Sequence, residues 1–299
     1  MINGKTIKKI MYQLIEGLKI VPSYAHINWE DRVLLSSGTE QASVSTDRAS
    51  TPYCRDAIVP QLPWRKLTDV EQQILFSSQL ENSSNLYVTI LSIPPKILGH
   101  LNELSNVKEH RTLDDILQKD QVKKGISLIQ EHIETFRLQS ADLTKYGIGW
   151  NAPNQMTVTV GNRDCRVGLH IDNPRGSSLH RILINLGSEP HYFLFINLSI
   201  QQLYSLVFKI DGNLVSETSG SSRIGRAFMQ RFPNYPVVKL RVEPGEAYIA
   251  PTEHITHDGC TEGTNSLDVF FTMRAIFDYQ GRVQHRVVMS RDPPLNPSY

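Results

Sequence analysis

The second half of the chain reads as a series of short β-strands, and this pattern restricts its fold more than any other feature. From Tyr146 onward, runs of apolar and β-branched residues alternate with turn residues such as Gly, Pro, Asn and Asp. Many short strands separated by such turns are typical of a β-sandwich or a β-barrel. The predicted strands are 155–160, 166–171, 180–186, 192–197, 237–242, 247–250 and 267–278, with helical insertions at 200–207 and 222–232.

The first 145 residues have a different character, because apolar residues recur there at helical spacing. They predict an amphipathic N-terminal helix that carries Ile7 and Leu18 on its apolar face. A polar segment, Ser36 to Thr51, is predicted to be a loop. The other predicted elements are helices at 68–80 and 121–138 and a strand at 86–93.

These differences divide the chain into three parts. Residues 1–145 are predicted to form an α-rich, mixed elaboration that packs on the core. Residues 146–285 are predicted to form the β-rich core, and residues 286–299 an extended tail.

His170, Ile171 and Asp172 form a triplet in one of the predicted strands. Because alternate side chains of a strand project to the same face, His170 and Asp172 point together while Ile171 points to the opposite layer. A third imidazole from a distant strand would complete a set of two histidines and one carboxylate. Such a set leaves half of an octahedral iron open for a co-substrate and dioxygen, which is the arrangement of a catalytic metal site.

Two downstream histidines, His254 and His257, compete for the role of third ligand. We favour His257 because it directly precedes Asp258 and Gly259, a strong turn signal that would place it at the end of a strand. His254 is the alternative. On a helix the two would be spaced like zinc ligands, but Pro251 and the β-rich surroundings oppose a helix, and the sequence has no HExxH motif.

Arg274 lies within an apolar strand further downstream. The strand is rich in β-branched and aromatic residues, and Arg274 shares one of its faces with Thr272. Burial of a guanidinium group in such surroundings costs free energy unless an anion pairs with it. Its planar arrangement of N–H donors suits bidentate hydrogen bonding to a carboxylate. Given the triplet upstream, Arg274 is predicted to anchor a co-substrate carboxylate, with Thr272 beside it.

An HxD triplet, a distal His and a downstream Arg together resemble the pattern of the iron(II)/2-oxoglutarate-dependent oxygenases. The resemblance covers residues 146–280 and implies that His170, Asp172 and His257 bind iron(II) and Arg274 binds the distal carboxylate of 2-oxoglutarate. It implies a double-stranded β-helix, the jelly-roll, cupin-like core of that superfamily. It also implies that 2-oxoglutarate and dioxygen are consumed, succinate and carbon dioxide are released, and a substrate C–H bond is hydroxylated.

The stretch from Gly168 to Gly187 also looks like the aspartyl/asparaginyl β-hydroxylase and free-proline hydroxylase branch. In that branch a basic residue follows the metal triplet on the next strand, which implies that Arg181 contacts the metal-proximal end of 2-oxoglutarate. Asn185 shares the face of Arg181 in the predicted strand. It is therefore predicted to point toward the co-substrate or the substrate.

Composition restricts the partners and the compartment. With 31 basic and 30 acidic side chains among 299 residues, the formal net charge is +1, and no nucleic-acid-binding motif is present. No apolar run approaches the roughly 20 residues that cross a bilayer, and the N-terminal segment lacks the apolar run of a signal peptide. Three widely spaced cysteines, Cys54, Cys165 and Cys260, predict a reduced compartment without disulfides, and Cys260 is expected to be a buried or partly exposed thiol and not a metal ligand. We therefore expect a cytoplasmic protein that binds neither nucleic acid nor membranes.

Taken together, these features predict an iron(II)- and 2-oxoglutarate-dependent hydroxylase of a small molecule, such as an amino acid or a biosynthetic intermediate. Two alternatives stay open at the level of the sequence. The same core could hydroxylate a protein or peptide, or the chain could be a cupin-like metal-binding protein without redox turnover. The sequence determines neither the substrate nor the oligomeric state.

Overall fold

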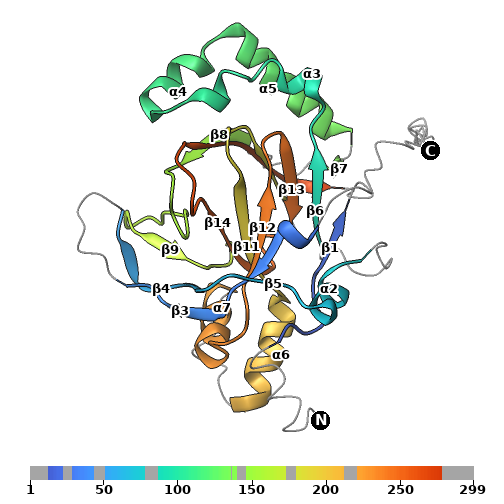
Figure 1. Cartoon of the computed structure of the whole chain (residues 1–299), viewed down its shortest axis with the longest axis vertical. Coiled ribbons are helices and arrows are strands. Elements are labelled where there is room, and N and C mark those ends of the chain that lie inside the picture. Colours follow the sequence, from blue (N-terminus) through green and yellow to red (C-terminus); the bar gives the residue numbers. More distant parts are fainter. Residues whose placement is uncertain are drawn as a thin grey trace, which may run out of the picture.

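The computed structural model of the chain describes residues 13–22, 29–43, 51–77, 87–135, 137–139, 146–172, 180–211 and 221–277 (Figure 1). Two β-sheets form the centre of this described part. The larger sheet has the strand order β1 (Lys19–Pro22), β6 (Tyr87–Ser92), β13 (Glu246–Ala250), β10 (His180–Asn185), β15 (Asp268–Phe277) and β7 (Arg137–Gln139), and β8 (Tyr146–Asn151) also pairs with β15.

The second sheet runs beside the first. Its strands lie in the order β14 (Ile255–Cys260), β11 (His191–Ser199), β12 (Val238–Val242), β2 (Val33–Leu35) and β5 (Arg65–Lys66). A smaller sheet joins β3 (Gly38–Gln41), β4 (Tyr53–Gln61) and β9 (Arg166–Gly168). Strands β1, β2, β5 and β6, all from the first 145 residues, thus extend the two main sheets.

Apart from β9, the segments after residue 146 alternate between the two main sheets, except that β11 and β12 follow each other in the second sheet. β8, β10, β13 and β15 belong to the larger sheet and pair antiparallel with one another in the order β8, β15, β10, β13. β11, β12 and β14 belong to the second sheet, and His170 forms an antiparallel bridge with His257 of β14. This alternation brings two segments together that lie far apart in the sequence.

A shared hydrophobic core lies between the two main sheets. It contains Leu183 and Tyr248 from the larger sheet and Phe193 and Phe195 from the second, and the rings of Tyr248 and Phe193 stack with centroids 4.2 Å apart. Because side chains alternate between the faces of a strand, the same strands also present an outer apolar face. Burial of these apolar surfaces is the dominant favourable contribution to folding.

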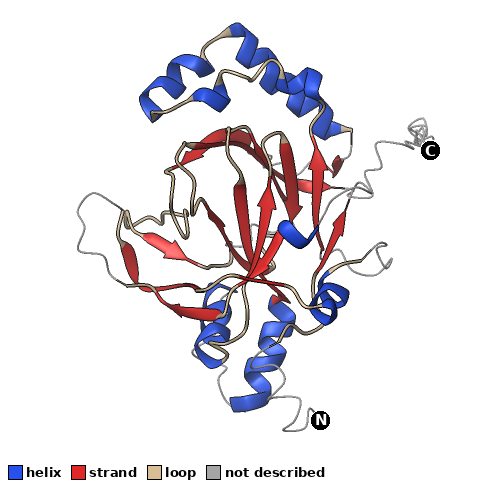
Figure 2. Ribbon diagram, in the orientation of Figure 1, coloured by secondary structure: helices blue, strands red, loops and turns tan. Residues whose placement is uncertain are grey.

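Helices α3 (Pro95–Leu98), α4 (His110–Leu117) and α5 (Asp120–Glu134) cover the outer face of the larger sheet (Figure 2), together with the 3-10 helix η2 (Leu104–Asn106). The helix predicted at 121–138 is confirmed as α5, and its buried residues Val122, Ile129 and Ile133 pack against outward residues of β10, β13 and β15. Helices α6 (Ile200–Asp211) and α7 (Ser221–Arg231) lie together at the other end of the molecule (Figure 1).

Helix α2 (Asp69–Leu75), which follows the 3-10 helix η1 (Trp29–Asp31) in chain order, has a clear start signal. Thr68 caps it: its hydroxyl accepts the Glu71 N–H at 3.3 Å, and the Glu71 carboxylate accepts the Thr68 N–H at 2.9 Å. This capping box satisfies two backbone donors at the helix end. The helix ends at Leu75, earlier than predicted, because Phe76 is extended and forms a bridge with Ile20.

Most of the predicted strands and helices after residue 180 are confirmed to within a few residues. The predicted strand 155–160 is wrong. The N–H groups of Val158 and Thr159 bind the Asp258 carboxylate at 3.3 and 3.1 Å in place of a neighbouring strand. The predicted loop 36–51 is wrong in part, since it contains β3.

The prediction that the chain lacks disulfides is wrong. Cys54 and Cys165 form a disulfide with an S–S distance of 2.04 Å, although they are 111 residues apart in sequence. Parallel pairing of β4 with β9, which places Tyr53 opposite Arg166, brings the two cysteines together. Cys260 is a buried free thiol, as predicted, and burial raises its pKa to about 12. The expectation of a reduced compartment therefore loses its support.

The described part of the N-terminus begins at residue 13. Leu14 and Leu18 are buried, but residues 13–18 are not helical, so the predicted helix does not extend to Leu18. Its earlier positions, and the predicted tail 286–299, lie outside the described residues. Within the described ranges, every helix is too short or too polar to cross a membrane.

Candidate metal centre

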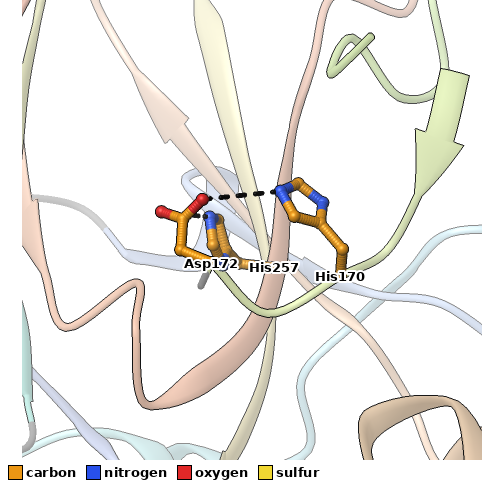
Figure 3. A group of neighbouring side chains, drawn as sticks. All are labelled: His170, Asp172 and His257. Carbon is orange, nitrogen blue, oxygen red and sulfur yellow. Dashed lines mark ion pairs between the residues drawn. The ribbon is translucent and has the colours of Figure 1, made fainter. Parts of the chain in front are cut away.

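Two backbone segments deliver the histidines of the predicted centre. The His170 N–H donates to the His257 carbonyl at 3.0 Å, and the His257 N–H donates to the His170 carbonyl at 2.7 Å. Residues that exchange both hydrogen bonds lie directly opposite each other in an antiparallel pair, and here the ring centroids are 4.9 Å apart. Asp172 follows two residues after His170, and its N–H donates to the Thr252 carbonyl at 3.3 Å. Figure 3 shows the three side chains converging.

Both imidazole rings present Nε2 to the Asp172 carboxylate. His170 Nε2 lies 3.8 Å from Oδ1 and His257 Nε2 lies 3.7 Å from Oδ2, and one ligand atom from each of the three residues fits within 4.8 Å of the others. On the far side of each ring, Nδ1 faces a carbonyl of its own strand, Gly168 at 2.9 Å and Ile255 at 3.2 Å. We assign the proton to Nδ1 from these contacts, which leaves both Nε2 lone pairs free to bind a metal.

His257, and not His254, is the histidine of β14 that joins this group within the described residues. The turn predicted after His257, which was the basis for preferring this residue, is wrong. Asp258 and Gly259 form no turn, because β14 continues through them to its end at Cys260. His257 therefore lies inside a strand, held by pairing on both sides.

Two arginines meet at the Asp172 carboxylate. Arg181 and Arg274 are direct cross-strand partners on β10 and β15. Nη2 of Arg181 lies 3.0 Å and Nη2 of Arg274 lies 2.7 Å from Asp172 Oδ2. The Arg274 Nη1 group also donates to the buried carboxylate of Glu253 at 2.9 Å. Among the described residues, Arg274 thus contacts two carboxylates of the protein itself.

These contacts set the charge of Asp172. Burial would raise the pKa of its carboxyl group, but His257, Arg181 and Arg274 outweigh burial and lower the pKa to about 2. The carboxylate is therefore ionised at every pH at which the protein is expected to work. An ionised carboxylate is the form that binds a metal cation.

The two histidines differ in their electrostatics. Burial lowers the pKa of His257 to about 4, so this imidazole is neutral near pH 7. Burial also acts to lower the pKa of His170, but the Asp258 carboxylate and the Gly168 carbonyl outweigh it and raise the pKa. Asp258, a residue that the sequence analysis had assigned only to a turn, is thus a neighbour of the predicted site.

Thr272 lies one inward position away from Arg274 on β15, where it pairs with Leu183 of β10. Its hydroxyl donates to the Ile182 carbonyl at 3.1 Å. An oxygen lone pair of the hydroxyl is left for another partner, so its predicted contact with a co-substrate stays a prediction.

Asn185 has a structural role in place of the predicted co-substrate contact. Its amide nitrogen donates to the carbonyls of Glu189 and Val242 at 2.9 and 3.0 Å, and its side-chain oxygen accepts the Gly187 N–H at 2.9 Å. Both amide hydrogens are used, and the residue is fully buried. The prediction failed because it used only the face of the strand that Asn185 shares with Arg181. Asn185 is the last residue of β10, and its side chain is hydrogen-bonded to the turn that follows.

Open space borders the centre on the side of β8. Gly147 pairs with Thr272, and a Cβ atom added to Gly147 would meet no described atom within 4 Å. At the next inward position, a Cβ on Gly149 would lie 2.6 Å from the Phe270 ring. Among the described residues, space is therefore left beside Gly147, whereas an aromatic ring fills it one step further along the strands.

Glu253 and Asp258 are the functional neighbours that sequence reasoning missed. Both lie close to His257 in sequence, and both are almost fully buried, with relative exposures of 1% and 0%. Charged residues are rarely buried unless they are paired. Their position next to a predicted ligand was visible in the sequence, but their contacts with Arg274 and His170 depend on the fold.

No family model and no curated protein matches the chain. Among solved structures, apo HygX from Streptomyces hygroscopicus is similar with a TM-score of 0.23 and 12% identity, over 62% of this chain and 80% of that one. Iron-bound HygX has a TM-score of 0.23 and 10% sequence identity, over 62% of this chain and 80% of that one. An N-substituted L-amino acid dioxygenase from Burkholderia ambifaria AMMD has a TM-score of 0.23 and 12% sequence identity, over 62% of this chain and 79% of that one. Similarity at this level does not support a functional assignment, so the proposed function rests on the geometry of the site.

Proposed function

We propose that the protein is an iron(II)- and 2-oxoglutarate-dependent oxygenase that hydroxylates a small molecule. One observation carries this proposal: His170, Asp172 and His257 converge with free Nε2 atoms and an ionised carboxylate, beside two arginines. In this proposal the three residues bind the metal. Arg181 and Arg274 bind the carboxylates of the co-substrate.

The donor set fits ferrous iron. Two imidazoles and one carboxylate on one side of the ion form the facial triad of non-haem iron(II) oxygenases and leave the other coordination positions open. The charges fit as well. Asp172 contacts both guanidinium groups, Glu253 contacts that of Arg274, and Asp258 lies beside His170. With neutral histidines, these three carboxylates and two guanidinium groups give a formal charge of −1. This excess of negative charge favours a divalent cation.

Once a divalent cation is bound, the centre has an excess of positive charge, and this favours an anionic co-substrate. The side chains of Arg181 and Arg274 are 27% and 20% exposed, so both are partly accessible, and Arg181 Nε is a buried donor without a partner among the described residues. Guanidinium groups bind carboxylates through charge-assisted hydrogen bonds. A dicarboxylate such as 2-oxoglutarate would balance the charge of the metal and engage these donors.

The strand order supports an oxygenase-type core. Eight segments after residue 146 build the two main sheets. β8, β10, β13 and β15 lie in the larger sheet, and the His170 segment, β11, β12 and β14 lie in the second. We propose that they form a double-stranded β-helix, in which two Greek keys build a jelly roll. The metal segments would then lie on neighbouring strands of its second sheet.

Bound iron would supply the oxidation of 2-oxoglutarate to succinate and carbon dioxide and of the substrate C–H bond by dioxygen. The protein's own residues hold the reactants and exclude water. Tyr248, Phe193 and Phe270 provide apolar walls around the interior. The space beside Gly147 and Thr272 is the place in this proposal for part of a small substrate or of the co-substrate.

The test is anaerobic addition of iron(II) and 2-oxoglutarate to the purified protein. We expect a weak visible charge-transfer absorption, lost in His257→Ala and retained in His254→Ala. Exposure to oxygen should then release succinate, and a screen of amino acids and related metabolites should find compounds that stimulate this release. A protein that binds iron(II) but gives no absorption and no succinate would be the metal-binding protein without redox turnover, and the proposal would be wrong.

A further inference from the structure

We propose that Asp258 is a positioning residue for the metal ligand His170: its buried Oδ2 atom, which has no hydrogen-bond partner among the described residues, lies 3.7 Å from His170 Nδ1. In this position the carboxylate keeps the Nδ1 proton on the far side of the ring and directs Nε2 toward Asp172. The inference rests on the proposed function, since it concerns the same metal centre.

The Asp258 carboxylate is locked in place by its other oxygen. Oδ1 accepts the N–H groups of Val158, Thr159 and Gly259 at 3.3, 3.1 and 2.7 Å and the Thr159 hydroxyl at 2.8 Å. The residue is 0% exposed. Four donors on one oxygen fix the plane of the carboxylate, so the direction in which Oδ2 points is set by the fold.

A buried carboxylate oxygen without a partner is costly, and this cost needs a compensating positive group. The Nδ1–H of His170 is the polar hydrogen that faces it. A metal bound at Nε2 withdraws charge from the ring and makes this hydrogen more positive, so the contact strengthens when the metal binds. A carboxylate behind a histidine ligand acts in this way: it fixes the tautomer and increases the basicity of the ligand.

Gly168 completes the arrangement. Its carbonyl lies 2.9 Å from His170 Nδ1, and its backbone has a φ of +71°, in the left-handed region that favours glycine. His170 Nδ1 therefore faces both a carbonyl and a carboxylate. His257 differs, because its Nδ1 faces the Ile255 carbonyl at 3.2 Å and no carboxylate pairs with that nitrogen among the described residues. The Nδ1 proton of His170 therefore faces two acceptors and that of His257 faces one.

The experiment uses the full chain with Asp258→Asn. Asparagine preserves the size of the side chain and an oxygen for the four donors, but it replaces Oδ2 with an N–H group that opposes the Nδ1–H of His170. Asp268→Asn is the matched control. Asp268 is also a buried aspartate that faces a histidine, His191, with Oδ2 2.8 Å from Nδ1, but it lies at the end of β15 remote from Arg274.

Two quantities are measured in each protein. The first is the affinity for cobalt(II), a spectroscopic substitute for iron(II) that is stable in air, by titration of its visible absorption. The second is the set of ring ¹⁵N chemical shifts of the histidines in the metal-free protein, which report the tautomer of each ring. We expect Asp258→Asn to weaken cobalt(II) binding roughly tenfold or more and to shift the His170 ring signals while those of His257 stay unchanged. Asp268→Asn should bind cobalt(II) as the wild type does.

The inference is overturned if Asp258→Asn binds cobalt(II) like the wild type, or if both variants lose affinity equally, which would indicate a general loss of stability. If the wild type binds no cobalt(II) and no iron(II), the proposed function fails. The ring-nitrogen shifts still decide on Asp258 in that case, because they are recorded without metal. Unchanged His170 signals in Asp258→Asn would contradict a positioning role.

Discussion

At the scale of single residues, Arg274 forms hydrogen bonds with both the candidate metal ligand Asp172 and the buried carboxylate of Glu253. Its guanidinium group donates to Asp172 at 2.7 Å and to Glu253 at 2.9 Å. Glu253 is 1% exposed, so Arg274 is a cation that compensates a carboxylate with little access to water. The residue therefore stabilises the site through carboxylates of the protein itself, in addition to the co-substrate role proposed for it.

Replacing Arg274 should therefore cost stability even without metal or co-substrate. We predict that Arg274→Ala lowers the free energy of unfolding by about 2–4 kcal/mol, because removal of one partner leaves a buried charge poorly compensated. Urea denaturation of the metal-free protein measures this change. The double variant Glu253→Gln/Arg274→Ala should recover part of the loss, and a single variant as stable as the wild type would show that the ion pair is unimportant.

His257 makes the stability of the metal-free protein depend on pH. Burial lowers its pKa to about 4 in the folded state, against 6.5 for an ordinary imidazole. Between these values the unfolded chain binds a proton that the folded chain does not, so stability falls as the pH decreases from about 6.5 to about 4. The loss due to His257 alone is about 3 kcal/mol. The raised pKa of His170 acts in the opposite direction, since its contribution is present at low pH and lost as the pH rises through that pKa.

The check is a series of urea denaturation curves from pH 4.5 to pH 7 without metal. His257→Leu removes the titrating group and retains an apolar side chain, so we expect a weaker decline of stability toward low pH than in the wild type. Equal declines in the two proteins would mean that His257 is not buried in its neutral form.

At the scale of the elements, the segment from Gly168 to Asp172 depends on one glycine. A Cβ at Gly168 would lie 2.4 Å from the Ile58 carbonyl oxygen, and the φ of +71° disfavours other residues. Gly168→Ala should therefore lower stability by roughly 2 kcal/mol or more and weaken metal binding through His170. Gly147→Ala, where a Cβ meets no described atom within 4 Å, should change stability by less than about 1 kcal/mol. Thermal denaturation and cobalt(II) titration of the two variants test this contrast, and equal effects would contradict it.

The disulfide fixes β4 to the segment that leads into β9. Cross-linking two positions 111 residues apart restricts the unfolded chain, and loops of this size typically give roughly 2–4 kcal/mol of stabilisation. We predict that reduction, or Cys54→Ser with Cys165→Ser, lowers stability by this amount. Thiol titration of the denatured protein should find one free thiol before reduction and three after it. Three thiols without reductant would show that the bond is absent.

Sequence patterns predicted some of these elements better than others, for a physical reason. β15 shows a regular alternation of buried and partly exposed residues, and β10 is a short run of mostly buried residues, so the positions of both strands were predictable. β14 was not, because Asp258 and Gly259 inside it are typical turn residues. Their presence in a strand depends on donors from the segment around Thr159, which no local pattern reveals.

At the scale of the whole molecule, the site could be predicted because its residue types are rare in such surroundings. His170, Asp172, His257 and Arg274 were all expected to meet, and the fold places them together. The internal partners of Arg274 and the contact of Asp258 with His170 were not expected. They arise from side-chain packing between segments that are distant in sequence, which a single sequence does not encode in any local pattern.

The two main sheets explain why these residues meet. The His170 segment and β14 lie side by side in one sheet, and β10 and β15 bring Arg181 and Arg274 from the other. The centre is therefore assembled by the same pairing that forms the hydrophobic core. A metal bound to residues from both segments would stabilise the folded state, since the unfolded chain has no preformed site.

The most direct measurement is an anomalous-scattering experiment on crystals prepared anaerobically with iron(II) and 2-oxoglutarate. The account predicts one iron peak bonded to Nε2 of His170, Nε2 of His257 and the Asp172 carboxylate, with 2-oxoglutarate on the open side in contact with Arg181 or Arg274. An iron peak at other residues, or no iron at this site in a folded protein, would contradict it.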